Sequence, residues 1–283
     1  MIVDAHVHYW DPGTLHYPWL DEIAALDRAF LPPEYRAAAA TVPVSKLVFV
    51  EANCRPDETL REVKIIERLV ETEPRLAGIV AFADVAQGLG AGGSGLGRTL
   101  DVLARSPLVK GVRQNIQGRP AGFCVQREFV EGVREVGRRG LTFDLCATHD
   151  QLGDVVQLVR QCPDTRFVLD HCGKPAIRDQ RLEPWRTEIS AMAAHEHVSC
   201  KISGLLTEAP ASGWVDADLA PYADWVVERF GAERVIFGSD WPVLTLAGSY
   251  CDWYRFTRAF TATWTAAERN GFYGDNATRV YDL

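Results

Sequence analysis

The feature that most constrains the fold is a series of short apolar runs, rich in β-branched residues, that recur about every 30 residues along the chain. Each run is nearly continuous rather than alternating, which is typical of strands buried on both faces of a parallel sheet. We predict eight strands, at residues 2–3, 47–50, 79–82, 109–112, 141–145, 167–169, 198–202 and 235–237.

Helical patterns separate most of the predicted strands. Asp57 and Asp150 each precede apolar residues at helical spacing, so we expect both carboxylates to cap the helices that follow them. Thr265 and Glu268 form a capping-box pattern near the C-terminus. This alternation of strand and helix predicts repeated βαβ units and a parallel sheet.

The chain length favours a (β/α)8 barrel that occupies residues 1–283 as one domain. An open doubly wound sheet is the alternative. It more often carries a Gly-rich phosphate loop after its first strand, where this sequence reads HVHYWDPG. Residues 86–97 read AQGLGAGGSGLG and contain neither GxxxxGK[ST] nor a strict GxGxxG, so we interpret them as a flexible connection.

Composition limits the partners that we expect for this chain. The formal net charge is −8 and no basic run occurs, which disfavours binding to nucleic acid. No apolar run is long enough for a membrane span, and the N-terminal MIVDAHVH has no signal-peptide pattern, so we expect a cytoplasmic protein. The seven cysteines form no CxxC pair and are interpreted as reduced core residues. Barrels of this kind often pair, so the oligomeric state is left open between a monomer and a homodimer.

Polar side chains stand where predicted strands end, and the carboxyl ends of the strands form the catalytic face of a parallel barrel. His6 and His8 are two residues apart on the first strand, so both imidazoles project from the same face. His171 follows the sixth strand and Asp240 follows the eighth. Convergent histidines and a carboxylate can bind a divalent cation or stabilise an oxyanion, so this set predicts an active site.

Five further residues are candidates for the same site. His149 follows the fifth strand and belongs either to the site or to the turn that begins the next helix. Arg113 on the fourth strand is either an anion clamp or a structural ion pair. Lys201 on the seventh strand is functional if it points inward and solvated if it points outward. Trp10 and Trp241 lie beside the motifs and could shape a substrate pocket.

Several motifs together carry a family resemblance. They are DAHVHYW at 4–10, YPWL at 17–20, FDLC at 143–146, HCGKP at 171–175, KISGL at 201–205, FGSDWP at 237–242 and GDNA at 274–277. Over nearly its whole length the chain resembles the amidohydrolase-related family. Within that family it is most similar to the sugar lactonase branch, which includes L-fuconolactonases, L-rhamnonolactonases and dicarboxylate lactonases.

The resemblance implies a barrel that hydrolyses a lactone ester. Asp240 would take a proton from water, provided that burial raises its pKa toward the working range. His6, His8 and His171 would polarise the carbonyl oxygen, directly or through a metal ion. The resemblance also implies that Arg113, and with it His149, holds the substrate.

The resemblance leaves the metal content open between none and one divalent ion, with Zn²⁺ preferred. His6, His8, His171 and Asp240 would be the ligands. Superfamily members with two metals use a bridging Lys or Glu at the end of the fourth strand. This strand instead ends in Arg113-Gln114-Asn115, and Lys110 lies at its start, so no binuclear centre is expected.

The sequence leaves two other functions open. One is a metal-dependent decarboxylase on the same barrel, and the other is a catalytically inactive barrel that only binds ligands. The expected partner is a small-molecule lactone. The nearby Trp10, Trp19 and Trp241 favour a sugar lactone, whereas Arg113, Arg119 and Lys174 could serve a dicarboxylate lactone.

Overall fold

A computed structural model gives the fold of residues 1–88 and 95–283. One sheet contains eight parallel strands in sequence order, each paired with the next. The strands are β1 (Ile2–Val7), β2 (Val44–Val50), β3 (Leu76–Phe82), β4 (Val109–Arg113), β5 (Thr142–Leu145), β6 (Phe167–Leu169), β7 (Val198–Ile202) and β8 (Val235–Phe237). All eight predicted strands are confirmed, and the barrel rather than the open doubly wound sheet is the fold.

The barrel closes where β1 meets the end of β8. Val7 forms a parallel bridge with Trp241, and the His8 amide donates to the Trp241 carbonyl over 2.8 Å. The Asp240 amide donates to the His6 carbonyl over 2.9 Å. The two ends of the sheet are therefore joined at the residues that carry the HxH motif and the last aspartate.

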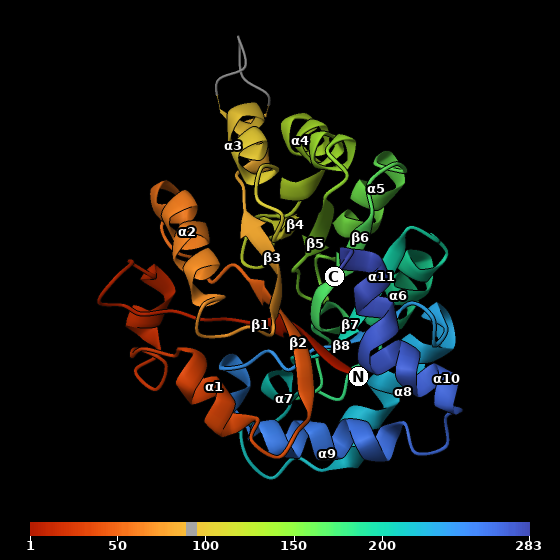
Figure 1. Cartoon of the computed structure of the whole chain (residues 1–283). Coiled ribbons are helices and arrows are strands. Elements are labelled where there is room, and N and C mark those ends of the chain that lie inside the picture. The colour runs from red at the N-terminus through yellow and green to blue at the C-terminus, as the bar shows by residue number, and fades with distance from the viewer. Residues whose placement is uncertain (89–94) are drawn as a thin grey trace.

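Helices surround the strands in Figure 1, and both chain termini lie at the same end of the barrel. The helices are α1 (Pro32–Ala38), α2 (Thr59–Leu69), α3 (Leu96–Leu103), α4 (Arg127–Arg138), α5 (Leu152–Gln161), α6 (Trp185–Ala193), α7 (Leu205–Glu208), α8 (Asp216–Phe230), α9 (Tyr250–Phe260), α10 (Ala266–Asn270) and α11 (Asn276–Tyr281). Of the predicted Gly-rich connection at 86–97, residues 89–94 lie outside the described residues.

One of the three predicted helix caps is confirmed. The Thr265 hydroxyl accepts from the Glu268 amide, and the Glu268 carboxylate accepts from the Thr265 amide, as the capping box requires. The caps predicted at Asp57 and Asp150 are wrong. A 3-10 turn precedes α2, and the Asp57 carboxylate pairs with Arg55 instead. The Asp150 carboxylate accepts from the Thr148 hydroxyl.

A small apolar cluster fills the barrel at the end where the chain begins and finishes. Val3 and Ala5 of β1 contact side chains from the neighbouring strands and from α11. Ala277 and Tyr281 of α11 belong to the same cluster and close this end. A larger apolar cluster lies between the strands and the surrounding helices. The site therefore stands on a solid interior rather than over an open channel.

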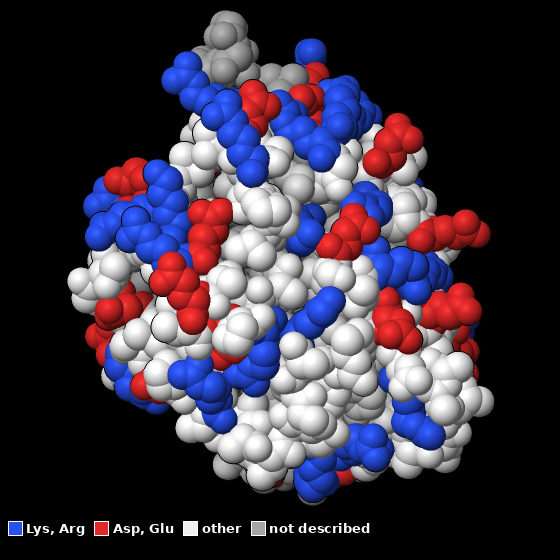
Figure 2. Space-filling model, in the orientation of Figure 1, with Lys and Arg blue, Asp and Glu red and all other residues white. Residues whose placement is uncertain are grey.

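Six of the seven cysteines are buried, in agreement with the expectation for core residues, and Cys251 is exposed. The face in Figure 2 shows basic and acidic side chains interspersed around a largely uncharged centre. Within the described residues, no helix is long and apolar enough to cross a membrane.

Helix α2 carries a buried carboxyl group. Glu62 is 1% exposed, and one of its oxygens accepts from the Ala52 amide over 3.3 Å. The other oxygen has no hydrogen-bond partner among the described residues. Burial, reinforced by the neighbouring Glu51, raises the pKa of Glu62 to about 8, so the group folds as the neutral acid.

We expect the free energy of unfolding to fall as the pH rises and the buried Glu62 carboxyl group ionises. Its pKa is higher in the folded than in the unfolded chain, so its stabilising contribution is complete below the unfolded value and disappears as the pH rises through about 8. Between pH 7 and pH 9 this change is worth about 1.4 kcal/mol. Thermal melts of the parent should show a falling midpoint over this range, and melts of Glu62→Gln a smaller fall. Equal slopes in the two proteins would contradict this assignment.

Candidate active site

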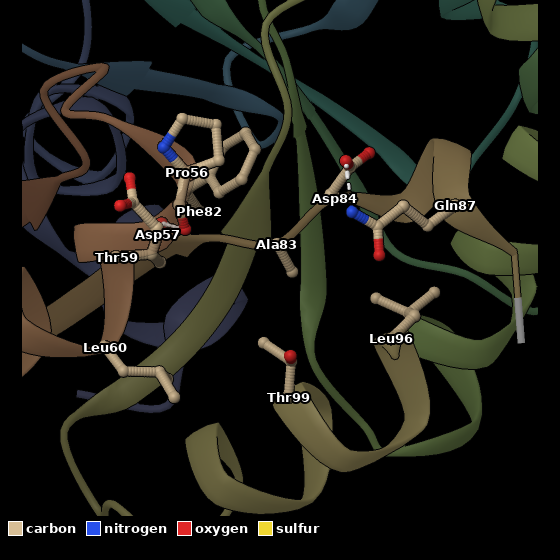
Figure 3. A pocket seen from close by; sticks show the side chains of 10 residues that line it. All are labelled: Pro56, Asp57, Thr59, Leu60, Phe82, Ala83, Asp84, Gln87, Leu96 and Thr99. Atoms are coloured by element: carbon tan, nitrogen blue, oxygen red, sulfur yellow. Dashed lines mark hydrogen bonds between the residues drawn. The ribbon is translucent and has the colours of Figure 1, made fainter. Parts of the chain in front are cut away.

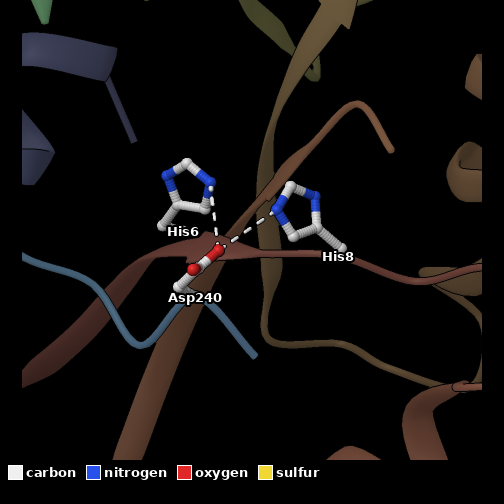
Figure 4. A group of neighbouring side chains, drawn as sticks. All are labelled: His6, His8 and Asp240. Carbon is white, nitrogen blue, oxygen red and sulfur yellow. Dashed lines mark ion pairs between the residues drawn. The ribbon is translucent and has the colours of Figure 1, made fainter. Parts of the chain in front are cut away.

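Three histidines surround one carboxylate oxygen at the mouth of the barrel. The Nε2 atoms of His6, His8 and His171 lie 3.8, 3.5 and 3.8 Å from Oδ1 of Asp240. Figure 4 shows the two histidines of the first strand directed at this carboxylate. All four side chains are buried. The structure thus brings together the four residues that the sequence places at three different strand ends.

A register shift in β1 aims the HxH motif inward. The pairing of β1 with β2 is irregular between Asp4 and Val7, so Asp4 does not share the direction of the histidines. The Asp4 carboxylate accepts from the hydroxyls of Tyr35 and Tyr250, on helices α1 and α9. It also accepts from the Ser239 amide over 2.8 Å, which fastens the start of β1 to the end of β8.

His171 and Asp240 occupy backbone conformations that non-glycine residues rarely adopt. Their φ angles are 55° and 63°, in the left-handed region. The His171 Nδ1 atom lies 2.8 Å from the Ser203 hydroxyl, which holds the ring. A Cβ at Gly204 would come within 2.5 Å of the same Nδ1 atom, so only glycine fits beside it. Strain of this kind persists where the surrounding contacts fix a functional geometry.

The tautomer of His8 makes the set suitable for a cation. Its Nδ1 atom lies 2.8 Å from the Val50 carbonyl oxygen, which can only accept, so Nδ1 carries the hydrogen. In the neutral ring, Nε2 then carries a lone pair that faces the Asp240 carboxylate, and the two acceptors repel each other. A proton or a metal ion between them removes this repulsion. Ligand atoms of His6, His8 and Asp240 lie within 4.8 Å of one another, and those of His6, Asp170 and His171 do so as well.

The ionisation states differ from one sequence-based expectation. Burial lowers the pKa of His171 to about 4 and that of His6 well below its ordinary value, so both rings are neutral near pH 7. Burial alone would raise the pKa of Asp240, but His171, His8 and His6 hold it below its usual value. The expectation that burial raises the pKa of Asp240 is therefore wrong. His171 is protonated at the low pH at which a carboxyl group titrates, and its charge, with the smaller effects of His8 and His6, outweighs the loss of water. Asp240 is therefore ionised in the resting site near neutral pH.

A buried ion network lies beneath the histidines. The Lys201 ammonium lies 2.6 Å from Asp144 Oδ2, 3.0 Å from Asp170 Oδ1 and 3.3 Å from His6 Nδ1. Asp170 also contacts Arg113 over 3.2 Å and His6 Nδ1 over 3.3 Å. Burial alone would lower the pKa of Lys201, but Asp144 and Asp170 hold it above its ordinary value. Lys201 thus points inward, although it contacts His6 rather than the open cavity.

The cavity above the histidines has a volume of about 330 Å³. Its walls come from the loops that follow six of the strands, and they combine amide, aromatic and charged groups. The lining residues are His8, Trp19, Glu22, Ile23, Ala52, Asn53, Arg113, Asn115, Gln117, Cys146, His171, Lys174, Asp240 and Val243. Arg113 lines this cavity, but its Nε and NH2 atoms donate to Glu51 and its NH1 contacts Asp170.

The structure places three of the other candidate residues outside the cavity walls. Trp10 is buried, and its indole N–H donates to the Leu26 and Arg28 carbonyls over 3.1 and 3.0 Å. It packs edge-on against Trp19, which does line the cavity. Trp241 is buried against aromatic rings of the segment after β1. His149 lies at the edge, with its Nδ1 atom 3.2 Å from the Lys174 carbonyl oxygen.

The cavity also contains residues to which sequence reasoning assigned no function. Asn53 and Asn115 follow β2 and β4, and Gln117 comes two residues later. Only their positions after strand ends indicate in the sequence that they belong to the site, because such positions face the mouth of a parallel barrel. Amide side chains have no distinctive spacing, so this signal did not separate them from ordinary loop residues.

A second cleft of about 170 Å³ lies beside α2 and α3, and Figure 3 shows it. Asp84 follows β3 and lines this cleft instead of the histidine cavity. Its two oxygens accept from the amide groups of Gln114 and Gln87, over 2.8 and 2.9 Å. With both oxygens occupied in this way, Asp84 fixes the loops after β3 and β4.

The fold and this site define a class: a parallel (β/α)8 barrel hydrolase with an HxH motif on the first strand and an aspartate after the last. The amidohydrolase family model matches residues 3–283. The chain therefore belongs to the amidohydrolase family.

Known relatives agree with this placement. The L-fucono-1,5-lactonase of Burkholderia multivorans is 30% identical over 296 aligned residues, which cover 99% of this chain and 96% of that protein. A crystal structure of a Burkholderia multivorans amidohydrolase with bound zinc has a TM-score of 0.87 and 29% identity, and covers 100% of this chain and 99% of that one. The 5-carboxyvanillate decarboxylase of Sphingomonas paucimobilis has a TM-score of 0.70 at 13% identity, covers 100% and 99% of the two chains, and shares the fold.

We expect Lys201→Met to destabilise the protein by about 3–5 kcal/mol, because it leaves the buried Asp144 carboxylate without its cation and Asp170 with Arg113 alone. Urea denaturation measures the change. Lys64→Met, an exposed substitution on α2, is the matched control. The double variant Lys201→Met, Asp144→Asn should lose less than the sum of the two single changes. A loss no larger than that of the control would contradict the inferred network.

Proposed function

We propose that this protein hydrolyses a neutral, hydroxylated lactone, and that Asp240 accepts the proton of the water molecule that opens the ring. The observation that carries the proposal is the convergence of three imidazole Nε2 atoms on one ionised carboxylate at the floor of a polar cavity. The relatives named as lactonases support the same reaction class.

The reaction is the transfer of an acyl group from the ring oxygen to water. Asp240 accepts a proton as the water oxygen bonds to the lactone carbonyl carbon, and the carbonyl becomes an oxyanion. His171 lines the cavity and polarises the carbonyl oxygen, whereas His6 is buried beneath the cavity and would act on the carbonyl only as a ligand of a bound ion. The ring C–O bond then breaks, and the proton held at Asp240 passes to the departing alkoxide. The products are a carboxylate and a new hydroxyl group, with one proton released near neutral pH.

The donor set fits one divalent ion, with zinc favoured by the imidazole and carboxylate ligands. We propose that His6, His8 and Asp240 hold it, with His171 adjacent. Such an ion would supply Lewis-acid polarisation and lower the pKa of bound water. The Nδ1–H of His8, fixed on the Val50 carbonyl, orients the ring for this ligation.

The charges in the cavity favour a neutral substrate over a dicarboxylate. Of the three basic residues considered for a dicarboxylate, Arg113 is paired with Glu51 and Asp170, and Lys174 is paired with Glu208. The side chain of Arg119 instead stacks on Phe123. Two substrate carboxylates would therefore compete with existing ion pairs.

The other walls suit a hydroxylated ring. Asn53, Asn115 and Gln117 supply amide donors and acceptors, and Trp19 supplies an aromatic face. This combination is suited to sugar-like molecules, which present hydroxyl groups at their edge and an apolar ring face. The solved decarboxylases resemble this chain only in fold, at 11% and 13% identity.

Proton release tests the proposal, with a panel of lactones that includes L-fucono-1,5-lactone, γ-lactones of sugar acids and 2-pyrone-4,6-dicarboxylate. We expect hydrolysis above the spontaneous rate for a sugar lactone. Asp240→Asn should lower kcat by about 100- to 10,000-fold with the fold retained. Asp57→Asn, in the separate cleft, is the control. Absence of acid release from every lactone, or equal rates for Asp240→Asn and the parent, would refute the proposal.

A further inference from the structure

Lys174 is one of three charged residues of the cavity, with Glu22 and Arg113, that the reaction chemistry does not use. It belongs to the HCGKP motif after β6, and it lines the same cavity as His171 and Asp240. Its Nζ atom donates to Glu208 Oε1 over 3.0 Å. An ammonium group carries three donors, and this bond uses one of them. Two N–H groups are left for other partners at the cavity wall.

The backbone of Lys174 is fixed from two sides. Its amide donates to the His171 carbonyl over 2.8 Å, and its carbonyl accepts from the His149 amide over 3.3 Å. Its φ angle of 45° is in the left-handed region, which a non-glycine residue adopts only when its surroundings hold it there. Lys174 therefore leaves the loop in one set direction.

His149 contributes to this fixation through its side chain. The Arg181 guanidinium donates to His149 Nε2 over 2.7 Å, and because Arg can only donate, Nε2 is an acceptor. The hydrogen of the neutral ring is then on Nδ1, which lies 3.2 Å from the Lys174 carbonyl oxygen and donates to it. This contact explains why His149 is at the edge of the site and yet does not line the cavity.

Glu208 fixes the other end of the side chain. It lies at the end of α7, and its own backbone carbonyl accepts from the Arg178 amide over 3.0 Å. Burial alone would lower the pKa of Lys174, but Glu208 holds it above its ordinary value, so the ammonium stays charged. The ion pair leaves little net charge at this wall, which suits a hydroxyl group better than a carboxylate.

We propose that Lys174 is a specificity-determining residue that donates a hydrogen bond to a ring hydroxyl oxygen of the lactone. Glu208 and His149 are positioning residues that act through Lys174. This inference rests on the proposed lactonase function and adds the contact by which the site distinguishes hydroxylated from unsubstituted rings. Sites built to bond a substrate hydroxyl discriminate strongly against analogues that lack it.

The test compares two substrates, L-fucono-1,5-lactone and unsubstituted δ-valerolactone, for each protein. Lys174→Met should lower the ratio of their kcat/KM values by about 10-fold or more, mainly through a higher KM for the hydroxylated lactone. Lys174→Arg should recover part of the ratio. Lys64→Met, on the exposed face of α2, should keep the parent ratio. Thermal melts establish that each variant is folded.

A separate pair of variants tests whether His149 positions Lys174. His149→Leu removes the side-chain donor, whereas His149→Asn retains an N–H near the place of Nδ1. We expect His149→Leu to raise KM for L-fucono-1,5-lactone about 10-fold, and His149→Asn to raise it less.

The outcomes separate the two proposals. A parent protein that hydrolyses neither lactone, nor any other of the panel, refutes the proposed function. A parent that hydrolyses both, with an unchanged ratio in folded Lys174→Met, refutes only the contact assigned to Lys174. An unchanged KM in His149→Leu, beside a changed ratio in Lys174→Met, refutes the positioning function of His149.

Discussion

The structure of the site depends on the salt bridge between Lys201 and Asp170 inside the barrel. This bridge connects β7 to the end of β6, and both partners contact His6 on β1 at 3.3 Å. Arg113 of β4 and Asp144 of β5 extend it to the neighbouring strands. Buried charges are tolerated only when paired, so these strands cannot shift independently of one another. The three histidines of the site thus lie directly above a buried network of paired charges.

Closure of the barrel and assembly of the site occur at the same atoms. The hydrogen bonds that join β1 to the segment after β8 belong to His6, His8, Asp240 and Trp241, so the backbone itself places Asp240 beside the histidines. Asp4 strengthens this junction from outside by accepting from the Ser239 amide. At the opposite end of the barrel, the Tyr281 hydroxyl of α11 donates to Asp144 and covers that side of the buried ion network. Residues at opposite ends of the chain therefore support one centre.

Much of this architecture could be predicted from the sequence. Eight continuous apolar runs fix eight buried strands, and the spacing of His6 and His8 fixes their common face. The placement of Trp10, Trp241 and Lys201 could not be predicted, because adjacency in sequence does not tell whether a side chain faces a cavity or the packing behind it. The lowered pKa of Asp240 could not be predicted from the sequence either. Burial alone raises this pKa, and the opposing effect depends on the distances to three imidazoles, which only the structure gives. The contact between His149 and Lys174 joins two loops and has no local signature.

A crystal structure with an inert lactam analogue of a sugar lactone tests the central claim most directly. We expect the lactam carbonyl carbon to lie beside Asp240 and its oxygen to lie within hydrogen-bond distance of His171 or of an ion held by the histidines. We expect the ring hydroxyls to lie toward Trp19 and Lys174. An analogue bound in the cleft between α2 and α3, or bound in the main cavity with its carbonyl directed away from Asp240, would contradict it.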